Sequence, residues 1–404
     1  MPIRFYTALI AALLAASHAA ARLVMVHDSG TLADAVAGAR AGDDIVLADG
    51  SYAITHKLWA KASGSVTAPI TVRAEHPLGA HITSGVLVGF EVTGGYWHFA
   101  GLDITGVCRN DSDCEHAFHV VGNASGYQLS GSRLVDFNAQ LKVNSDGAHH
   151  LPADGLVENN EFFDTHPRHT NNPVTPVNID NAVRWVVRGN WIHDFEKDGT
   201  GDGSYGAFVK GGSQRPVIER NLVACSSHDA AIGRPVGLSF GADGMDANLC
   251  PPHWDTTHPC SPEVTGGIMR NNIIDRCRGD GIYLSKARES KILYNTLTNT
   301  AGIEFRTPES NGVVRGNLMM GSIRAVDGAR FHDGGNVSGV ISRQKLASWQ
   351  AAQPGRTAGP DPDVTDDYCG RPRGKTLEAG ALQASLGPCP RPQWSGNARA
   401  SATP

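Results

Sequence analysis

Residues 186–192 read Val-Val-Arg-Gly-Asn-Trp-Ile, and residues 217–223 read Val-Ile-Glu-Arg-Asn-Leu-Val. This pattern recurs around six asparagines: Asn160, Asn190, Asn221, Asn272, Asn295 and Asn317. Successive asparagines are separated by 30, 31, 51, 23 and 22 residues. Short β-rich runs repeated with such a period are typical of stacked coils, none of which can bury its inner face alone. The sequence therefore predicts an all-β solenoid, a right-handed parallel β-helix.

The six asparagines are interpreted as scaffold. Asparagine tolerates the left-handed turn that such a coil needs, and stacked side-chain amides can hydrogen-bond from one coil to the next. The 51-residue interval is predicted to be one coil that carries a loop. Its insertion is residues 249–262, which contain Cys250 and Cys260.

Both ends of the chain differ in composition from the repeats. Residues 1–21 have Arg4 followed by a short apolar run and small residues, which is typical of a cleaved signal peptide. Residues 31–39 have helical spacing and are predicted to cap the first coil. The β-helix domain is predicted to span residues 22–345. Residues 346–404 are rich in Pro and Gly and are predicted to form an irregular C-terminal cover and tail.

The 404 residues carry a formal net charge of only −5. No global basic field exists to hold nucleic acid or an anionic membrane, so neither is an expected partner. No apolar run after the signal peptide is long enough for a membrane span. The mature protein is expected to be a monomer that is secreted or periplasmic.

Eight cysteines fit an oxidising compartment. Their spacing predicts the local pairs Cys108–Cys114, Cys250–Cys260 and Cys369–Cys389. Cys225 and Cys277 each follow the same repeat motif, so they are predicted to bridge adjacent coils.

A resemblance to a known family is carried by the N-terminal part of the chain. Residues 41–52 read Ala-Gly-Asp-Asp-Ile-Val-Leu-Ala-Asp-Gly-Ser-Tyr, residues 68–74 read Ala-Pro-Ile-Thr-Val-Arg-Ala, and residues 94–102 read Gly-Gly-Tyr-Trp-His-Phe-Ala-Gly-Leu. These stretches resemble the chondroitinase B and alginate lyase family of polysaccharide lyases. The resemblance implies a secreted right-handed β-helix that acts on an acidic polysaccharide.

In that family, the resemblance implies, a Lys base and an Arg act on a uronic acid beside a calcium ion. Lys210 is similar in placement to the family's Lys. The family's acidic calcium ligands stand seven and five residues before the Lys, where this chain has Gly203 and Tyr205. The Arg expected on the next coil is replaced by Gly241.

Strand alternation allows the outward face to be drawn, because every second side chain of a strand points away from the core. One outward column is predicted to contain Asn178, Lys210, Gly241, Ser285 and Arg306, and its neighbour Phe208, Ser239, Tyr283 and Glu304. Adjacent coils lie about 4.8 Å apart, so Lys210 and Arg306 are expected about 14 Å apart, roughly the length of three sugar units.

β-Elimination from a uronic acid needs a neutralised carboxylate, a base for the ring proton and an acid for the leaving oxygen. The predicted catalytic residues are Lys210, Tyr283, Arg234 and His228, and the predicted substrate contacts are Asn178, Arg306, Glu304 and Phe208. Lys210 is the base and His228 the alternative base. Tyr283 is the proton donor, and Asn178 with Arg234 or Arg306 holds the carboxylate.

Glycine-flanked acidic residues lie in loops beside the Lys210 coil: Asp198, Asp202, Asp243 and Asp246. Carboxylate oxygens suit Ca²⁺, so Asp243 and Asp246 are candidate calcium ligands. A solvated loop explains the same residues without a metal.

These features together favour a polysaccharide lyase that cleaves a uronic-acid-containing polysaccharide by β-elimination. Two alternatives stay open. A uronate C5-epimerase shares the proton abstraction but returns the proton to the sugar, and a non-catalytic β-helix would bind glycans or serve in adhesion.

Overall fold

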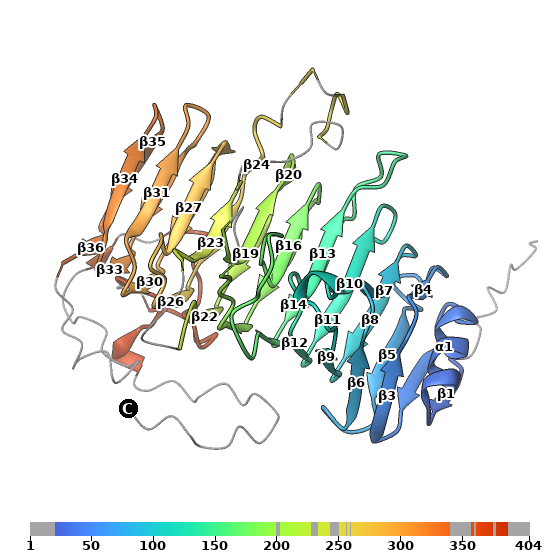
Figure 1. The fold of residues 1–404 in the computed structure, drawn as a ribbon. Coiled ribbons are helices and arrows are strands. Elements are labelled where there is room, and N and C mark those ends of the chain that lie inside the picture. The colour runs from blue at the N-terminus through green and yellow to red at the C-terminus, as the bar shows by residue number, and fades with distance from the viewer. Residues whose placement is uncertain are drawn as a thin grey trace, which may run out of the picture.

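The computed structural model describes residues 21–198, 203–227, 233–242, 250–255, 257–258, 260–339, 357–358, 361–374 and 377–386. Its strands form three long parallel sheets that run the length of the molecule (Figure 1). Each coil contributes one strand to each sheet in turn. The predicted right-handed parallel β-helix is therefore confirmed.

The twelve-stranded sheet contains β1 (Leu23–Val26), β2 (Asp44–Leu47), β5 (Ile70–Ala74), β8 (Trp97–Ala100), β11 (Gln128–Ser130), β14 (Leu156–Glu158), β17 (Val186–Arg188), β21 (Val217–Glu219), β25 (Ile268–Arg270), β29 (Ser290–Leu293), β32 (Asn311–Arg315) and β35 (Arg330–Gly334). The eleven-stranded sheet contains β3 (Gly50–Ile54), β6 (Ala80–Ser84), β9 (Asp103–Gly106), β12 (Arg133–Val135), β15 (Glu161–Phe163), β18 (Trp191–His193), β22 (Leu222–Ala224), β26 (Ile273–Asp275), β30 (Thr296–Thr298), β33 (Leu318–Met319) and β36 (Val337–Ser338).

The ten-stranded sheet contains β4 (Leu58–Ala60), β7 (Val88–Val92), β10 (His116–Val121), β13 (Leu141–Asn144), β16 (Val177–Asp180), β19 (Tyr205–Lys210), β23 (Val236–Phe240), β27 (Ile282–Ser285), β31 (Gly302–Arg306) and β34 (Ser322–Val326). The short elements are β20 (Ser213–Gln214), β24 (Val264–Thr265), β28 (Ala287–Arg288), β37 (Thr357–Ala358), β38 (Leu377–Glu378), η1 (Asp111–Asp113) and η3 (Ala384–Leu386).

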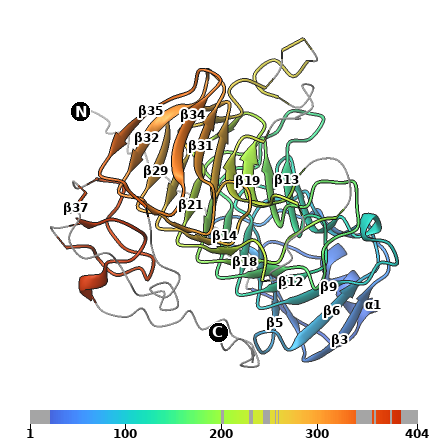
Figure 2. The same cartoon turned by 60° about the vertical axis from the view of Figure 1, so that its left-hand side comes forward.

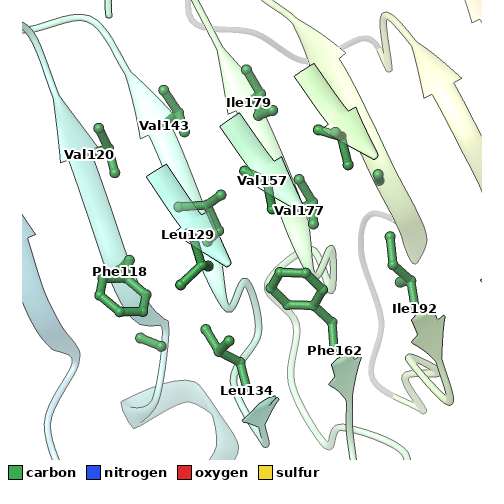
Figure 3. Packing of buried hydrophobic residues seen from close by; sticks show 14 of the residues in the cluster. Phe118, Val120, Leu129, Leu134, Val143, Val157, Phe162, Val177, Ile179 and Ile192 are labelled. Atoms are coloured by element: carbon green, nitrogen blue, oxygen red, sulfur yellow. The ribbon is translucent and has the colours of Figure 1, made fainter. Parts of the chain in front are cut away.

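The core is a set of apolar rows that run from coil to coil. Val120, Val143 and Ile179 lie in register on β10, β13 and β16, and Phe162 and Ile192 lie in register on β15 and β18 (Figure 3). All five side chains are buried. Because inward and outward side chains alternate, this burial fixes which side chains of each strand face solvent.

The asparagine ladder is confirmed. All six repeat asparagines are fully buried. Asn190 Nδ2 donates to Asn221 Oδ1 at 3.0 Å, and Asn221 Nδ2 donates to Asn272 Oδ1 at 3.0 Å. The expectation that the ladder asparagines themselves adopt the left-handed turn is wrong. The residue before each of them has positive φ, as at Gly189 (64°) and Arg220 (54°), so that the asparagine side chain can turn inward.

A helix and a disulfide-linked framework support the coils. Helix α1 (Ser29–Ala37) packs against the first coil through Leu32 and Val36, as expected of the N-terminal cap. The predicted disulfides Cys108–Cys114, Cys225–Cys277 and Cys250–Cys260 are present. Cys369 is also disulfide-bonded, but its expected partner Cys389 lies outside the described residues.

The described part of the C-terminal segment was expected to cover the end of the helix. It packs instead against the side of several coils, where it is drawn in red beside the orange strands (Figure 2). Arg220 pairs with Asp366 at 2.8 Å, and Val364 and Leu377 pack on Tyr294. The polar turns before the ladder asparagines present arginine and tyrosine side chains that this segment covers.

The predicted signal peptide, residues 1–21, falls almost wholly outside the described residues. Within the described part of the chain, no helix has the length and apolar character required to cross a membrane.

Candidate functional site

Two columns of outward side chains follow the ten-stranded sheet, and together they are called the outer face. Strand register places the first column as Trp59, Glu91, His119, Lys142, Asn178, Phe208, Ser239, Tyr283, Glu304 and Arg324. The second column, two residues further along each strand, includes Asn144, Asp180, Lys210, Gly241, Ser285 and Arg306. Figure 1 shows these strands side by side from β4 to β34.

One register differs from the sequence prediction. Asn178 was expected at the level of Lys210, but its register partner on β19 is Phe208, and Asp180 is the partner of Lys210. The reason is that Val177 and Ile179 are both buried, so either could have been aligned with Val209. Alternation alone gives the outward set and leaves the register between distant strands undefined.

Lys142, Asn178 and Asp180 form a cluster that sequence reasoning missed. Lys142 Nζ donates to Asn178 Oδ1 at 2.9 Å and forms an ion pair with Asp180 Oδ2. Asp180 is 3% exposed, and its buried Oδ1 has no hydrogen-bond partner among the residues that the structure describes. The available signal was residues 141–144, Leu-Lys-Val-Asn, whose alternation places Lys142 and Asn144 outward.

A second cluster surrounds Glu91. Lys57 Nζ lies 2.8 Å from Glu91 Oε2, and His119 Nδ1 lies 3.2 Å from Glu91 Oε1. His119 Nε2 lies 2.6 Å from Asn144 Oδ1. Burial opposes ionisation of Glu91, but the hydrogen bonds from His119 and Lys57 outweigh it and hold the pKa of Glu91 at about 2.

In both clusters the cation is the more exposed partner. The side chain of Lys57 is 36% exposed and that of Glu91 is 9%, while the corresponding values are 18% for Lys142 and 4% for Asp180. Solvent therefore meets the ammonium groups above their carboxylates. A surface layered in this way presents ammonium groups that can meet the acidic groups of a polyanion.

Lys210 carries its charge above an aromatic ring. Its Nζ lies 4.6 Å from the centroid of Phe208, which packs edge-on against Tyr205. Phe208 is only 2% exposed, so the expectation that it contacts a substrate is wrong. Among the described residues, no carboxylate lies within ion-pair distance of Lys210. The assignment of Lys210 as the base stays a prediction.

The C-terminal coils hold three of the predicted residues, Tyr283, Glu304 and Arg306, in existing contacts. Arg306 Nε donates to Asp327 Oδ2 at 2.7 Å, and Asp327 followed by the Tyr283 hydroxyl raises the pKa of Arg306. Glu304 accepts from Arg324 at 3.0 Å. Tyr283 and Arg306, which were placed in neighbouring columns, therefore contact each other, whereas Glu304 is held in an ion pair with Arg324.

Arg324 and Arg234 both interact electrostatically with the Asp280 carboxylate. Arg324 forms an ion pair with Asp280, and Arg234 lies near enough for its charge to act on that carboxyl. Burial nevertheless raises the pKa of Asp280. Arg234 itself is exposed. The other expected residues of this region, His228, Asp243 and Asp246, lie outside the described residues.

The described residues do not provide the calcium site that the family resemblance implies. No group of three or more His, Cys, Asp or Glu side chains in the described part of the chain is arranged to hold a metal ion. Asp180 places one oxygen on Lys142, and Asp198 lies 2.7 Å from His169.

Comparison with solved structures shows the fold. A pectate lyase matches with a TM-score of 0.64 at 14% identity, covering 90% of this chain and 96% of that chain. A rhamnogalacturonan lyase matches with a TM-score of 0.58 at 15% identity, covering 84% of this chain and 95% of that chain. At such low identity the likeness extends to the fold and no further.

Comparison by sequence matches a smaller part of the chain. The family model described as periplasmic copper-binding protein (NosD) matches residues 261–339. No curated protein matches the sequence significantly.

The matched residues do not fit a copper site. Cys277 is bonded to Cys225, Met319 is buried in the core, and the described residues of this region contain no metal-binding group of His, Cys, Asp and Glu. The match covers coils of the β-helix. The chain thus has the right-handed parallel β-helix fold that pectate and rhamnogalacturonan lyases also have.

Proposed function

We propose that the protein cleaves a uronic-acid-containing polysaccharide by β-elimination, with Lys210 as the base. The carrying observation is the state of Lys210: a half-buried ammonium over the Phe208 ring, with no carboxylate of the described residues in ion-pair distance. The outer face around it presents cations above buried carboxylates. An extended acidic chain fits such a face because it can follow one sheet across many coils.

Asn178 supports this proposal from the neighbouring coil. Its Oδ1 accepts from Lys142, which turns its Nδ2 group away from that ammonium. Nδ2 makes no hydrogen bond to another described residue. An amide donor beside the proposed base can bind a substrate carboxylate and stabilise the charge that develops when the adjacent proton leaves.

The proposed reaction balances at one sugar. Unprotonated Lys210 takes the proton from C5 of the uronate, the electron pair forms the C4–C5 double bond, and the bond from C4 to the glycosidic oxygen breaks. The ammonium then returns its proton to the leaving oxygen. Lys210 and Tyr283 stand two coils apart, about 10 Å along the sheet. Tyr283 and Arg306 are therefore placed to bind a neighbouring uronate.

Two other cations of the outer face are already held in ion pairs and are therefore not candidates for the base. Lys142 is held by Asp180, and Arg324 is held by Glu304 and Asp280. Lys142 and Arg324 fix the geometry of the outer face and contribute to its electrostatic potential. Lys210 and the exposed Arg234 face the substrate. The two alternative functions, a uronate C5-epimerase and a non-catalytic glycan-binding protein, would use the same outer face. The experiment below distinguishes them from a lyase.

The test is incubation of the full chain with polygalacturonate, alginate, rhamnogalacturonan and chondroitin sulfate. Unsaturated chain ends are followed by ultraviolet absorbance, and uronate stereochemistry by NMR. The proposal expects unsaturated ends with at least one polymer, lost in Lys210→Ala. Lys291→Ala is the matched control, because Lys291 lies on the twelve-stranded sheet and pairs with Asp363.

Three results would contradict the proposal. Inverted uronates without chain cleavage would identify an epimerase, and retention of polymer without any new signal would identify a binding protein. Unsaturated ends that persist undiminished in Lys210→Ala would leave the lyase activity but remove Lys210 as its base.

A further inference from the structure

Trp59 is an exposed indole at the N-terminal end of the outer face. Its strand, β4, is the edge strand of the ten-stranded sheet, and its side chain is 44% exposed. By contrast, Trp97 and Trp185 are buried in the core. Trp59 is the most exposed of the tryptophans in the described part of the chain. An indole displayed on a rigid strand offers a flat apolar surface to a ligand.

Two lysines flank this indole on the same side of the chain. Lys57 Nζ lies 4.9 Å from the ring and Lys61 Nζ lies 4.7 Å from it. Lys57 is held at Glu91, whereas no carboxylate of the described residues lies within ion-pair distance of Lys61. The platform therefore combines an apolar ring with one ammonium that is free to meet an anion.

The chemistry of this platform matches one kind of ligand. A uronate has an apolar C–H face that can stack on an indole, and a carboxylate at its rim that can reach a neighbouring ammonium. A neutral sugar would use only the ring, and a phosphate would use only the cation. Trp59 and Lys61 together favour an anionic sugar.

The position of Trp59 connects it to the proposed reaction centre. Trp59 belongs to the first column, which passes through Glu91, His119, Lys142 and Asn178 before it reaches Phe208 beneath Lys210. Five strand spacings separate β4 from β19, or about 24 Å. A chain bound at Lys210 would have to run along this column to reach Trp59, past the ammonium groups of the Lys142 and Lys57 ion pairs.

We propose that Trp59 and Lys61 form a distal subsite that binds one uronate of a long acidic polysaccharide lying along the outer face. This inference rests on the proposed function for its ligand. It adds that the protein prefers chains long enough to span the five coils, and that the polymer extends from Lys210 toward the N-terminal cap.

The test measures binding, so that it is independent of cleavage. Lys210→Ala protein is titrated with polygalacturonate, alginate and chondroitin sulfate fragments, sorted into short chains that cover the Lys210 coil and long chains that reach Trp59. Adding Trp59→Ala should weaken binding of long chains about tenfold, because an aromatic anchor is lost, and leave short chains unaffected. Trp59→Phe should retain most of the affinity.

Two further readouts separate the ring from the charge. Binding of long chains should change the fluorescence of the Lys210→Ala protein, and Trp59→Phe should remove that change. Lys61→Gln should weaken long-chain binding and reduce its dependence on salt. Arg330→Ala on the twelve-stranded sheet and Trp191→Ala on the eleven-stranded sheet are controls for loss of a cation and of an indole, and should have no effect.

The outcomes distinguish this subsite from the proposed reaction. Equal long-chain affinity with and without Trp59, or an equal loss for short and long chains, overturns the subsite. Absence of binding to every polymer overturns it as well. Chain-length-dependent binding through Trp59 without unsaturated product from the native protein would support the subsite and contradict the lyase.

Discussion

Asp180 and Lys210 occupy the same register position on neighbouring strands, β16 and β19. The carboxylate of Asp180 is buried and turned to Lys142, while the ammonium of Lys210 lies over Phe208. Of the two lysines on the strands that flank β16, Lys142 is therefore the partner of Asp180, and Lys210 is the one proposed to meet the ligand. This division of roles is the basis of the candidate site.

The Lys142–Asp180 pair should be strongly coupled. Asp180→Asn is expected to lower the free energy of unfolding by about 2 kcal/mol, because a largely buried ammonium loses its carboxylate. The double variant Asp180→Asn, Lys142→Met should recover most of that loss. Urea unfolding of the four proteins in the cycle gives the coupling energy. Additive effects of the two substitutions would contradict the ion pair.

Glu91 should make stability depend on acidic pH. Its pKa is about 2 in the folded protein, below the usual 4.5. A carboxyl whose folded pKa is depressed contributes stability that is complete above 4.5 and is lost as pH falls toward 2. The stability difference between the native protein and Glu91→Gln should thus be constant near neutral pH and shrink below about 4.5.

The measurement for Glu91 is urea unfolding of both proteins across this range. Glu75→Gln is a suitable control, because Glu75 directly follows β5 of the twelve-stranded sheet and no cation of the described residues lies within ion-pair distance of it. A difference that stays constant down to the lowest pH would show that the hydrogen bonds from Lys57 and His119 do not depress the pKa of Glu91.

The inter-coil disulfide should stabilise more than the local one. Cys225 and Cys277 are 52 residues apart, and Cys108 and Cys114 are 6 apart. Loop-closure entropy predicts about 4 kcal/mol for the first bond and about 2 kcal/mol for the second. Thermal and urea unfolding of the two paired Cys→Ala variants compares them. Equal losses of stability would show that the entropy of the unfolded chain is not the main origin of the stabilisation by these disulfides.

The interior of the asparagine ladder should be more sensitive than its end. Asn221→Ala removes an oxygen that accepts from both the backbone and the side chain of Asn190, leaving buried donors without partners. We expect a loss of about 3 kcal/mol. At Asn336, which is only partly buried, water can replace the side chain, so the loss should be about 1 kcal/mol. Urea unfolding measures both, and similar losses would contradict this reasoning.

Much of the scaffold could be predicted from local pattern. The spacing of Asn190 and Asn221 indicated stacked coils, and the place of Cys225 and Cys277 after equivalent motifs indicated their bond. Leu32 and Val36 have the helical spacing of the N-terminal cap. In each case the information lies within one repeat or in its recurrence, because every coil must bury the same inner face.

The arrangement of the outer face could not be predicted in the same way. Alternation identified Lys210, Tyr283 and Arg306 as outward, yet it misplaced Asn178 by one step and gave no reason to expect Phe208 to be buried. It also overlooked Lys142, whose role depends on a carboxylate 38 residues away.

The sequence by itself determined the stacked coils, the buried asparagine ladder and the set of side chains that point outward. Only the tertiary structure decided which outward charges meet, as in Lys142 with Asp180, and which remain open to a ligand, as in Lys210. The physical reason is that parallel strands of one sheet are joined by turns and loops of unequal length. Their register, and hence every contact between neighbouring coils, is set by packing in three dimensions.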